Sequence, residues 1–293
     1  MKQHLVSRVL LRRWSNHQRG PIAALDLDTL AERIDKVEDL GCVGDLVAVG
    51  AEHAERRWQD VERRLPHAFS QLDAGRLFND PRAAATIRDA IALHYARGVA
   101  LASMMRRMQA LSANRVADGV LAHVDPARLL HALTALVVPD AAAVSLARDR
   151  IHAEFHGHLE RQGFLGRQFL EHFDIARSKV AEYSLEVCTA VDHEFVIADV
   201  PVIAYDKDAD AVGILQGVPW GNADAILMAL GPRQVVALSR DNRDVPTPTS
   251  MAIAINSLQV RGAYKEVFFR PGSGLGATIA SAIRASRQTP PCS

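Results

Sequence analysis

The sequence predicts an α+β fold in which a mostly helical region, residues 1–184, packs on a small antiparallel sheet with a following helix in residues 185–293. Three observations predict this fold. Apolar residues recur at helical spacing through the first region, short branched apolar segments follow, and helical spacing returns after residue 249. Helices and strands that occupy separate parts of a chain are typical of α+β proteins. We expect the two regions to form one interlocked domain.

The first region contains segments with helical spacing throughout its length. They are residues 27–40, 51–75, 79–111, 125–137, 140–162 and 167–185. Asp26 and Asp28 can cap the first segment, and Asp80, which is followed by proline, can cap the third. The third segment should form one long central helix, because its apolar positions from Ile87 to Met108 recur three and four residues apart.

The later region contains segments that resemble strands. They are residues 184–191, 194–205, 225–230 and 234–239. These segments are short, apolar and rich in branched side chains, and aspartate, glycine and proline separate them, as is usual for strands joined by turns. Helical spacing returns in residues 249–267, and a weaker helix is expected at 277–286.

Composition narrows the class of protein. The chain has 293 residues, is 48% hydrophobic and has a formal net charge of zero, so it has no overall basic field for nucleic acid or membrane. No segment approaches 18 apolar residues, so we expect no membrane helix. The cysteines, Cys42, Cys188 and Cys292, form no CxxC pair, and the N-terminus has no signal-peptide pattern, which favours a cytoplasmic protein without a metal site or cofactor. The oligomeric state stays open.

Asp199 is an unusual residue for its surroundings, because it lies inside the apolar segment EFVIADVPVIAY, residues 194–205. A carboxylate there must find hydrogen-bond donors or shift its pKa. Pro201 ends the strand or confines it to an edge, because proline cannot donate to a sheet. We interpret Asp199 as a catalytic residue at a strand end that opens into a cleft; the alternative is a structural aspartate that caps the neighbouring turn.

His94 and Arg97 lie on the apolar stripe of the predicted central helix, directly before Gly98. The glycine leaves a hollow, which His94 and Arg97 could line as a pocket wall; the alternative is a core histidine bonded to a neighbour. The segment RDAIALH, from Arg88 to His94, also fits loosely the arginine and histidine pattern of helical ribonucleases of the HEPN type.

The N-terminal segment MKQHLVSRVLLRRW places His4, Arg8 and Arg12 four residues apart, which would put them on one face if the segment were helical. Such a face could bind an anion or could be a surface stripe. His152 and His156 have the spacing of metal ligands on a helix, but they flank an apolar stripe and lack the glutamate of an HExxH motif, so we favour a solvated flank.

These segments resemble the bacterial family named domain of unknown function four-two-three-eight. The family's initial histidine and leucine-arginine-aromatic step resemble His4 and LLRRW, and its spaced glutamates resemble Glu55 and Glu62 in CVGDLVAVGAEHAERRWQDVE. Its arginine after a long apolar helix resembles Arg97 in IALHYARG, and its late asparagine resembles Asn256 in INSLQVRGAYKEV. The resemblance covers about residues 1–270 and implies a shared site.

The clearest similarity is the family's serine-aspartate-x-proline-valine step, which appears here as ADVPV. Ala198 replaces the serine, which puts a hydroxyl role at that position in doubt, and Ser7 stands near the position of a usual proline. The resemblance marks residues from distant segments, which is what a convergent pocket requires.

The sequence therefore favours a hydrolase or nuclease-like enzyme that acts on a phosphate-bearing substrate, with RNA-linked substrates among the candidates. The predicted catalytic residues are His4, His94 and Asp199, with the histidines as general acid or base. The predicted substrate-binding residues are Arg12, Arg97 and Asn256. The alternative is a non-enzymatic sensor or partner-binding protein with a pocket for a small anion. The predicted partner is thus an anionic small molecule or RNA, and not a membrane.

Overall fold

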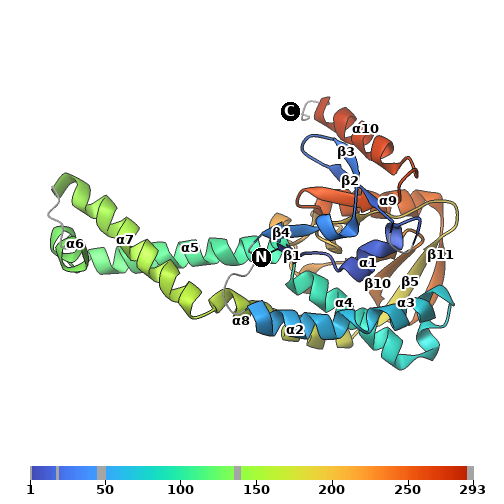
Figure 1. Ribbon diagram of the computed structural model, residues 1–293, viewed down its shortest axis with the longest axis horizontal. Helices are drawn as coiled ribbons and strands as arrows, with labels where there is room; N and C mark the ends of the chain where they lie inside the picture. The colour runs from blue at the N-terminus through green and yellow to red at the C-terminus, as the bar shows by residue number, and fades with distance from the viewer. Residues whose placement is uncertain (1, 18–19, 45–50, 135–139, 289–293) are drawn as a thin grey trace.

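The computed structural model describes residues 2–17, 20–44, 51–134 and 140–288, which form a body of sheets and helices from which a helical arm projects (Figure 1). The strands are β1 (Lys2–His4), β2 (Ile22–Asp26), β3 (Glu32–Asp35), β4 (Cys42–Gly44), β5 (Ser184–Ala190), β6 (Ile197–Ala198), β7 (Val202–Asp206), β8 (Ala211–Val212), β9 (Ala225–Gly231), β10 (Gln234–Ser239), β11 (Arg243–Thr247) and β12 (Glu266–Phe269). The α-helices are α1 (Arg8–Leu11), α2 (Ala51–Glu62), α3 (Leu65–Asp73), α4 (Pro81–Ala96), α5 (Val99–Leu121), α6 (Pro126–Thr134), α7 (Asp140–Arg161), α8 (Phe164–Ala181), α9 (Thr249–Gly262) and α10 (Leu275–Gln288). Short 3₁₀ turns are η1 (Arg12–Trp14), η2 (Val37–Asp39), η3 (Leu77–Asn79), η4 (Ile214–Gln216) and η5 (Trp220–Asn222).

The largest sheet has six strands in the order β11-β5-β10-β9-β7-β8. Strand β11 runs parallel to β5, and the other neighbours are antiparallel. Val236 of β10 pairs with Val187 of β5 on one side and with Met228 of β9 on the other, and all three side chains are buried. The centre of this sheet is therefore part of the core.

The second sheet joins the two ends of the described chain. Its order is β3-β2-β12-β6, and every pair in it is antiparallel. Strand β12 lies between β2 and β6, so that Ala23 pairs with Phe269 and Phe268 pairs with Ile197. Strands β1 and β4 form a separate two-stranded ladder near the N-terminus. One hydrophobic cluster includes residues from both predicted regions.

The predicted α+β class agrees with this architecture, but the prediction of a small, antiparallel, C-terminal sheet is wrong. The six-stranded sheet is mixed, and residues 22–44 contribute three strands, of which β3 lies within the segment 27–40 that we predicted as helix. The reason lies at Asp26, whose Oδ1 accepts the backbone N–H groups of Asp28 and Thr29 at 3.1 and 2.9 Å. This is an Asx turn, and with Leu30 at a φ of 57° it turns the chain into the β2–β3 hairpin instead of starting a helix.

The apolar segment around Asp199 passes from one sheet to the other. Strand β6 belongs to the four-stranded sheet and β7 to the six-stranded sheet, and the residues between them are Asp199, Val200 and Pro201. Proline is tolerated here because the chain leaves one ladder before it joins the next. The segment that we predicted as one strand is therefore two strands in different sheets.

The predicted long central helix is also divided. Helix α4 ends at Ala96, α5 begins at Val99, and Gly98 between them has the extended backbone angles φ −66° and ψ 142°. The predicted Asp80 cap is present, since its side chain accepts the N–H groups of Arg82 and Ala83. Helix α4 packs against α8, α3 and α2, whereas α5 leaves the body.

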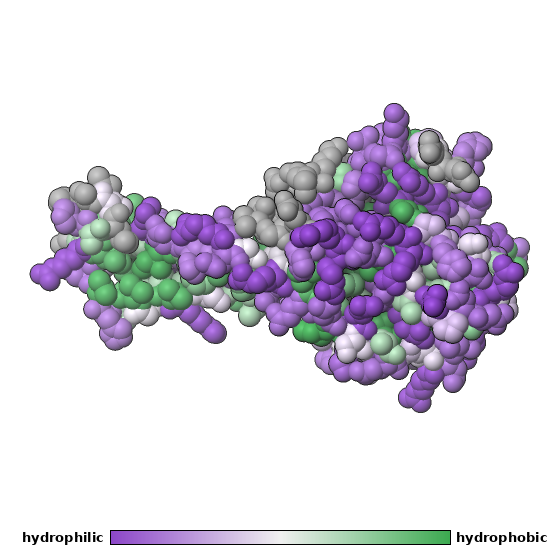
Figure 2. All heavy atoms as spheres, turned by 60° about the horizontal axis from the view of Figure 1, so that its bottom comes forward, coloured by the Kyte–Doolittle hydropathy of each residue, from purple (hydrophilic) through white to green (hydrophobic). Residues whose placement is uncertain are grey.

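Helices α5, α6 and α7 form the arm, which Figure 1 shows extending away from the sheets. Helix α5 packs along α7, and a small apolar cluster of Leu130, Ala143 and Ala147 joins α6 to α7. Apolar side chains also gather on the outer half of the arm in Figure 2. Leu111 of α5 and Val144 of α7 are among the exposed apolar residues. The predicted helices 125–137 and 140–162 correspond to α6 and α7, although residues 135–137 lie outside the described part. No helix within the described ranges combines the length and apolarity needed to span a membrane.

Candidate functional site

Three elements bring a group of polar side chains together where the N-terminal segment meets the helices. His4 ends β1, and Ser7 directly precedes α1. Helix α2 carries Glu55, Trp58 and Glu62, which are spaced three and four residues apart and therefore share one helix face. His94 and Arg97 come from the end of α4. We call these seven residues the polar cluster.

Ser7, Glu62 and Arg97 form the centre of the polar cluster. The hydroxyl of Ser7 donates to Glu62 Oε1 at 2.6 Å, and Arg97 donates from Nη1 to the same Glu62 oxygen at 2.8 Å and from Nη2 to Ser7 Oγ at 2.9 Å. Burial alone would raise the pKa of Glu62, but the charge of Arg97 and the hydrogen bonds from Ser7 and Arg97 outweigh it, so this pKa lies below its ordinary value. The ion pair is thus held in one geometry by a buried serine.

His94 positions this centre. Its Nδ1 lies 2.8 Å from the carbonyl oxygen of Ala90, and its Nε2 accepts the backbone N–H of Ser7 at 3.1 Å. This pairing requires a proton on Nδ1 and a lone pair on Nε2, which is the neutral ring. Burial, with the charge of Arg97 adding to it, lowers the pKa of His94 to about 4. Both ring nitrogens are therefore engaged by the backbone, and the geometry assigns His94 to holding Ser7.

His4 is differently placed. Burial first, and the charges of Arg8 and Arg97 with it, lower the pKa of His4, while a hydrogen bond to the backbone of Glu38 opposes them. The Nε2 atom is buried and finds no hydrogen-bond partner among the described residues. His4 is consequently a neutral imidazole near pH 7, with one buried ring nitrogen that has no partner among the described residues.

Two further N–H groups of the polar cluster have no hydrogen-bond acceptor in the described part of the chain. They are Arg97 Nε and Trp58 Nε1, and both side chains are almost fully buried, at 3% and 1% exposure. The guanidinium carbon of Arg97 lies 5.5 Å from the centre of the Trp58 ring. Buried donors usually have partners, so these two groups could serve an anionic oxygen.

Glu55 adds a second carboxyl group with the opposite tendency. Burial raises the pKa of Glu55, and the negative charge of Glu62 adds to this effect, while the charge of Arg97 opposes it. The cluster therefore holds one carboxyl group whose pKa is lowered, Glu62, and one whose pKa is raised, Glu55. Carboxyl groups with pKa values moved apart are typical of acid and base pairs in enzymes.

Asp199 lies elsewhere in the structure. Its carboxylate accepts the backbone N–H groups of Tyr264, Lys265 and Glu266 at 2.8, 2.8 and 3.1 Å, and so fixes the start of β12. Burial raises the pKa of Asp199 to about 6, against the opposing effect of these three donors. The described contacts of Asp199 do not include His4, and they match the alternative of a structural aspartate that caps a turn.

Asn256 also serves the backbone. Its side chain accepts the N–H of Val196 at 2.9 Å and donates to the carbonyl of Glu194 at 2.8 Å. Gln259, one turn later on α9, does the same for Ala198 N–H and the Pro201 carbonyl, at 3.0 and 3.2 Å. Strand β6 lies at the edge of its sheet, and these two side-chain amides bond the backbone groups there that have no neighbouring strand. The sequence reasoning did not single out Gln259, although its spacing of three residues from Asn256 was a usable signal.

Arg12 forms an exposed ion pair with Glu38 at 3.0 Å, and the two side chains are 41% and 50% exposed. His4 lies in β1 and not in a helix with Arg8 and Arg12, so the predicted common helix face is not formed. Of the six predicted site residues, the polar cluster contains His4, His94 and Arg97. The sequence reasoning did not commit to Ser7 or Trp58, and the family resemblance alone marked Glu55 and Glu62.

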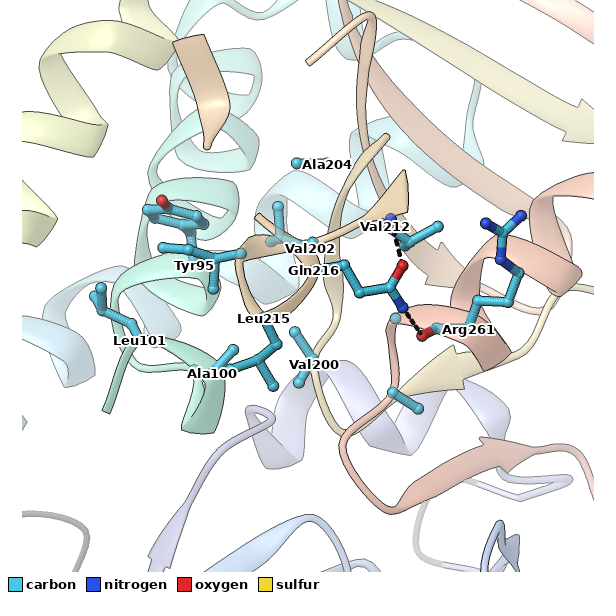
Figure 3. Close-up of a pocket in the computed structure, with 15 residues that line it drawn as sticks. Tyr95, Ala100, Leu101, Val200, Val202, Ala204, Val212, Leu215, Gln216 and Arg261 are labelled. Atoms are coloured by element: carbon cyan, nitrogen blue, oxygen red, sulfur yellow. Dashed lines mark hydrogen bonds between the residues drawn. The ribbon is translucent and has the colours of Figure 1, made fainter. Parts of the chain in front are cut away.

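A pocket lies on the other side of the α4–α5 break (Figure 3). Its volume is about 200 Å³, and Gly98 and Tyr95 lie in its wall. The predicted hollow at Gly98 is therefore present, but His94 and Arg97 do not line it. The described residues contain no group of three or more histidine, cysteine, aspartate or glutamate side chains placed to hold a metal ion.

Fold and cluster together define a class: a mixed α+β protein with a buried histidine–arginine–carboxylate group built from the N-terminal segment, α2 and α4. The chain belongs to the family described as "protein of unknown function (DUF4238)", which matches residues 2–273. The resemblance in the sequence motifs is thereby confirmed, and α10 lies beyond the matched part. No curated protein and no solved structure was found to match the chain.

Proposed function

We propose that the protein is a hydrolase that acts on a phosphate-bearing substrate and that the polar cluster is its active site. The observation that carries this proposal is the neutral His4 ring, whose Nε2 has no partner among the described residues, within the electrostatic reach of Arg97 and Glu62. A general base requires an available lone pair near neutral pH, and His4 has one.

Each residue has a distinct part in the proposed reaction. His4 Nε2 takes the proton from an attacking water or hydroxyl group as the new bond to phosphorus forms. Glu55, whose pKa is raised, gives a proton to the oxygen that leaves. Arg97 Nε and Trp58 Nε1 donate to the phosphoryl oxygens, where negative charge is concentrated. Glu62 and Ser7 keep Arg97 in place.

RNA is the macromolecular substrate to test first. The zero net charge argues against a general affinity for nucleic acid but allows a local cationic site. We infer that such binding would depend on Arg97 and not on Arg12, because Arg12 is exposed and paired with Glu38.

The alternative is a sensor that binds a small anion without turnover. The specific observation that favours it is that Arg97 Nε and Trp58 Nε1 are donors only, so a bound oxyanion alone would satisfy them. In this case His4 would add a contact but no proton transfer.

Purified protein incubated with tRNA, mixed RNA and nucleotides separates the two functions. The enzyme requires product formation that falls at least 100-fold in His4→Gln, the usual contribution of a general base, and that Arg12→Gln leaves unchanged. Binding of nucleotide or inorganic phosphate without product supports the sensor. Turnover retained in a folded His4→Gln protein would refute the assignment of His4, and neither turnover nor binding would refute the site.

A further inference from the structure

The pocket at the α4–α5 break is built from segments that are distant in the sequence. It lies between the end of α4, the start of α5, the passage from β6 to β7, the η4 turn and the end of α9. Figure 3 shows side chains from these segments converging on one space. The lining residues include Tyr95, Ala100, Leu101, Val202, Ala204 and Val212.

Two polar side chains in the wall, Gln216 and Arg261, already have partners within the protein. The amide of Gln216 accepts the N–H of Val212 at 2.9 Å and donates to the carbonyl of Arg261 at 3.3 Å. The Arg261 guanidinium donates to Asp210 Oδ1 at 2.9 Å and points away from the pocket in Figure 3. Since these groups are satisfied, a charged or strongly polar ligand would lose its hydration without replacement.

Glycines keep the space open. Gly98, Gly213 and Gly262 each contribute wall without a side chain. Gly213 has a φ of 76°, and a Cβ on Gly262 would collide with the Ile203 side chain, so neither position accepts another residue easily. Nothing lies within 4 Å of the place where a Cβ on Gly213 would stand, so this glycine leaves open space in the wall.

Volume and wall chemistry indicate the ligand. A cavity of about 150 Å³ lined by aliphatic and aromatic side chains holds benzene in another protein. The pocket here has about 200 Å³, enough for one ring with a small substituent. Tyr95 supplies an aromatic wall, and the Trp220 ring contacts it with ring centres 4.0 Å apart. The half-exposed Leu215 side chain, at 45% exposure, lies where a ligand could enter.

We propose that this pocket binds a molecule through a single uncharged aromatic ring. The ring would lie among Leu101, Val202 and Val212, and any charged substituent would remain outside at Leu215. This proposal does not rest on the proposed function, because the pocket and the polar cluster have no residue in common. It adds to the protein a second recognition site, for an apolar group.

Fluorobenzene is a suitable probe, because its ¹⁹F line broadens and shifts when the ring is bound. We expect saturable binding to the full-length protein, and at least a tenfold weaker affinity in Ala204→Leu and Ala100→Leu, whose larger side chains fill the pocket. Ala282→Leu makes the same change on the exposed side of α10 and should bind like the unchanged protein. Melting curves show whether each variant folds.

The unchanged protein also provides a test that needs no variant. In protein with labelled methyl groups, bound fluorobenzene should give nuclear Overhauser contacts to the methyl groups of Val202 and Val212. Absence of saturable binding overturns the proposal, as do contacts confined to methyl groups elsewhere or an affinity unchanged in a folded Ala204→Leu protein. Tighter binding of isobutanol than of fluorobenzene would overturn the choice of an aromatic ring.

Discussion

Acidification should destabilise the folded protein, because His94 can bind a proton more easily in the unfolded chain. The folded state holds this ring neutral between Ser7 and Ala90, with a pKa lowered to about 4 from 6.5. The unfolded chain binds the proton below pH 6.5, whereas the folded protein does not until about pH 4. The contribution of His94 to the free energy of unfolding is therefore fully present above pH 6.5 and is lost as the pH falls toward 4. At about 1.4 kcal/mol for each pH unit, the loss by pH 4 is about 3 kcal/mol.

His94→Gln isolates this effect. The glutamine oxygen can still accept the N–H of Ser7, but the side chain does not titrate. We expect this variant to be less stable than the unchanged protein at pH 7 and to lose about 3 kcal/mol less between pH 7 and 4. The assay is urea unfolding followed by circular dichroism at half-unit pH steps. The pKa of Glu62 lies below its ordinary value, so its titration affects mainly the acid end of this range.

His17→Gln is the matched control, because His17 is exposed. Its pH dependence should equal that of the unchanged protein. If His94→Gln showed the same acid loss as the unchanged protein, the neutral ring would not be the cause, and the assignment of His94 to holding Ser7 would be wrong.

Further substitutions test the other buried polar groups. Asp199→Ala should cost about 3 kcal/mol or more of unfolding free energy, because three backbone N–H groups lose their acceptor; a melting temperature like that of exposed Asp208→Ala would contradict the structural role. Glu62→Gln should lower the free energy of unfolding by about 2 kcal/mol, which is less than the loss expected on breaking a fully buried ion pair, because Glu62 is partly exposed. A loss below about 0.5 kcal/mol would show that the position of Arg97 does not depend on Glu62. Gly262→Ala should cost about 1–3 kcal/mol by overpacking, which urea unfolding measures; an unchanged midpoint would mean that the neighbouring side chains move aside.

Much of the helical part could be predicted from the sequence, because helical spacing and caps are local. The Asp80 cap and the helices around it illustrate this. The β2–β3 hairpin could not be predicted in the same way, since residues 27–40 fit helical spacing equally well. The Asx turn at Asp26 turns the chain, and the pairing of β2 with β12, which is distant in the sequence, then stabilises the hairpin.

The site was predictable only in part for a similar reason. His4 and Arg97 stood out as polar residues on apolar segments. Arg97 does bond Glu62 and Ser7, and His4 lies within the electrostatic reach of Arg97 and Glu62. Asp199 stood out by the same criterion, yet its partners are backbone groups near β12. A sequence pattern reveals that a buried polar residue needs partners, but only the tertiary arrangement reveals whether these are side chains of a site or the backbone of a turn.

The four-stranded sheet has a consequence for synthesis of the chain. Because β12 lies between β2 and β6, this sheet cannot close until residue 269 has left the ribosome. Until then the edge of β2 that later pairs with β12 has no neighbouring strand, and such unpaired edges promote aggregation of incomplete chains. A chain ending before Glu266 would never close the sheet. Arg287 of α10 donates to the carbonyl groups of Leu27 and Asp28, so α10 can hold the β2–β3 hairpin only after residue 287 has been added to the chain.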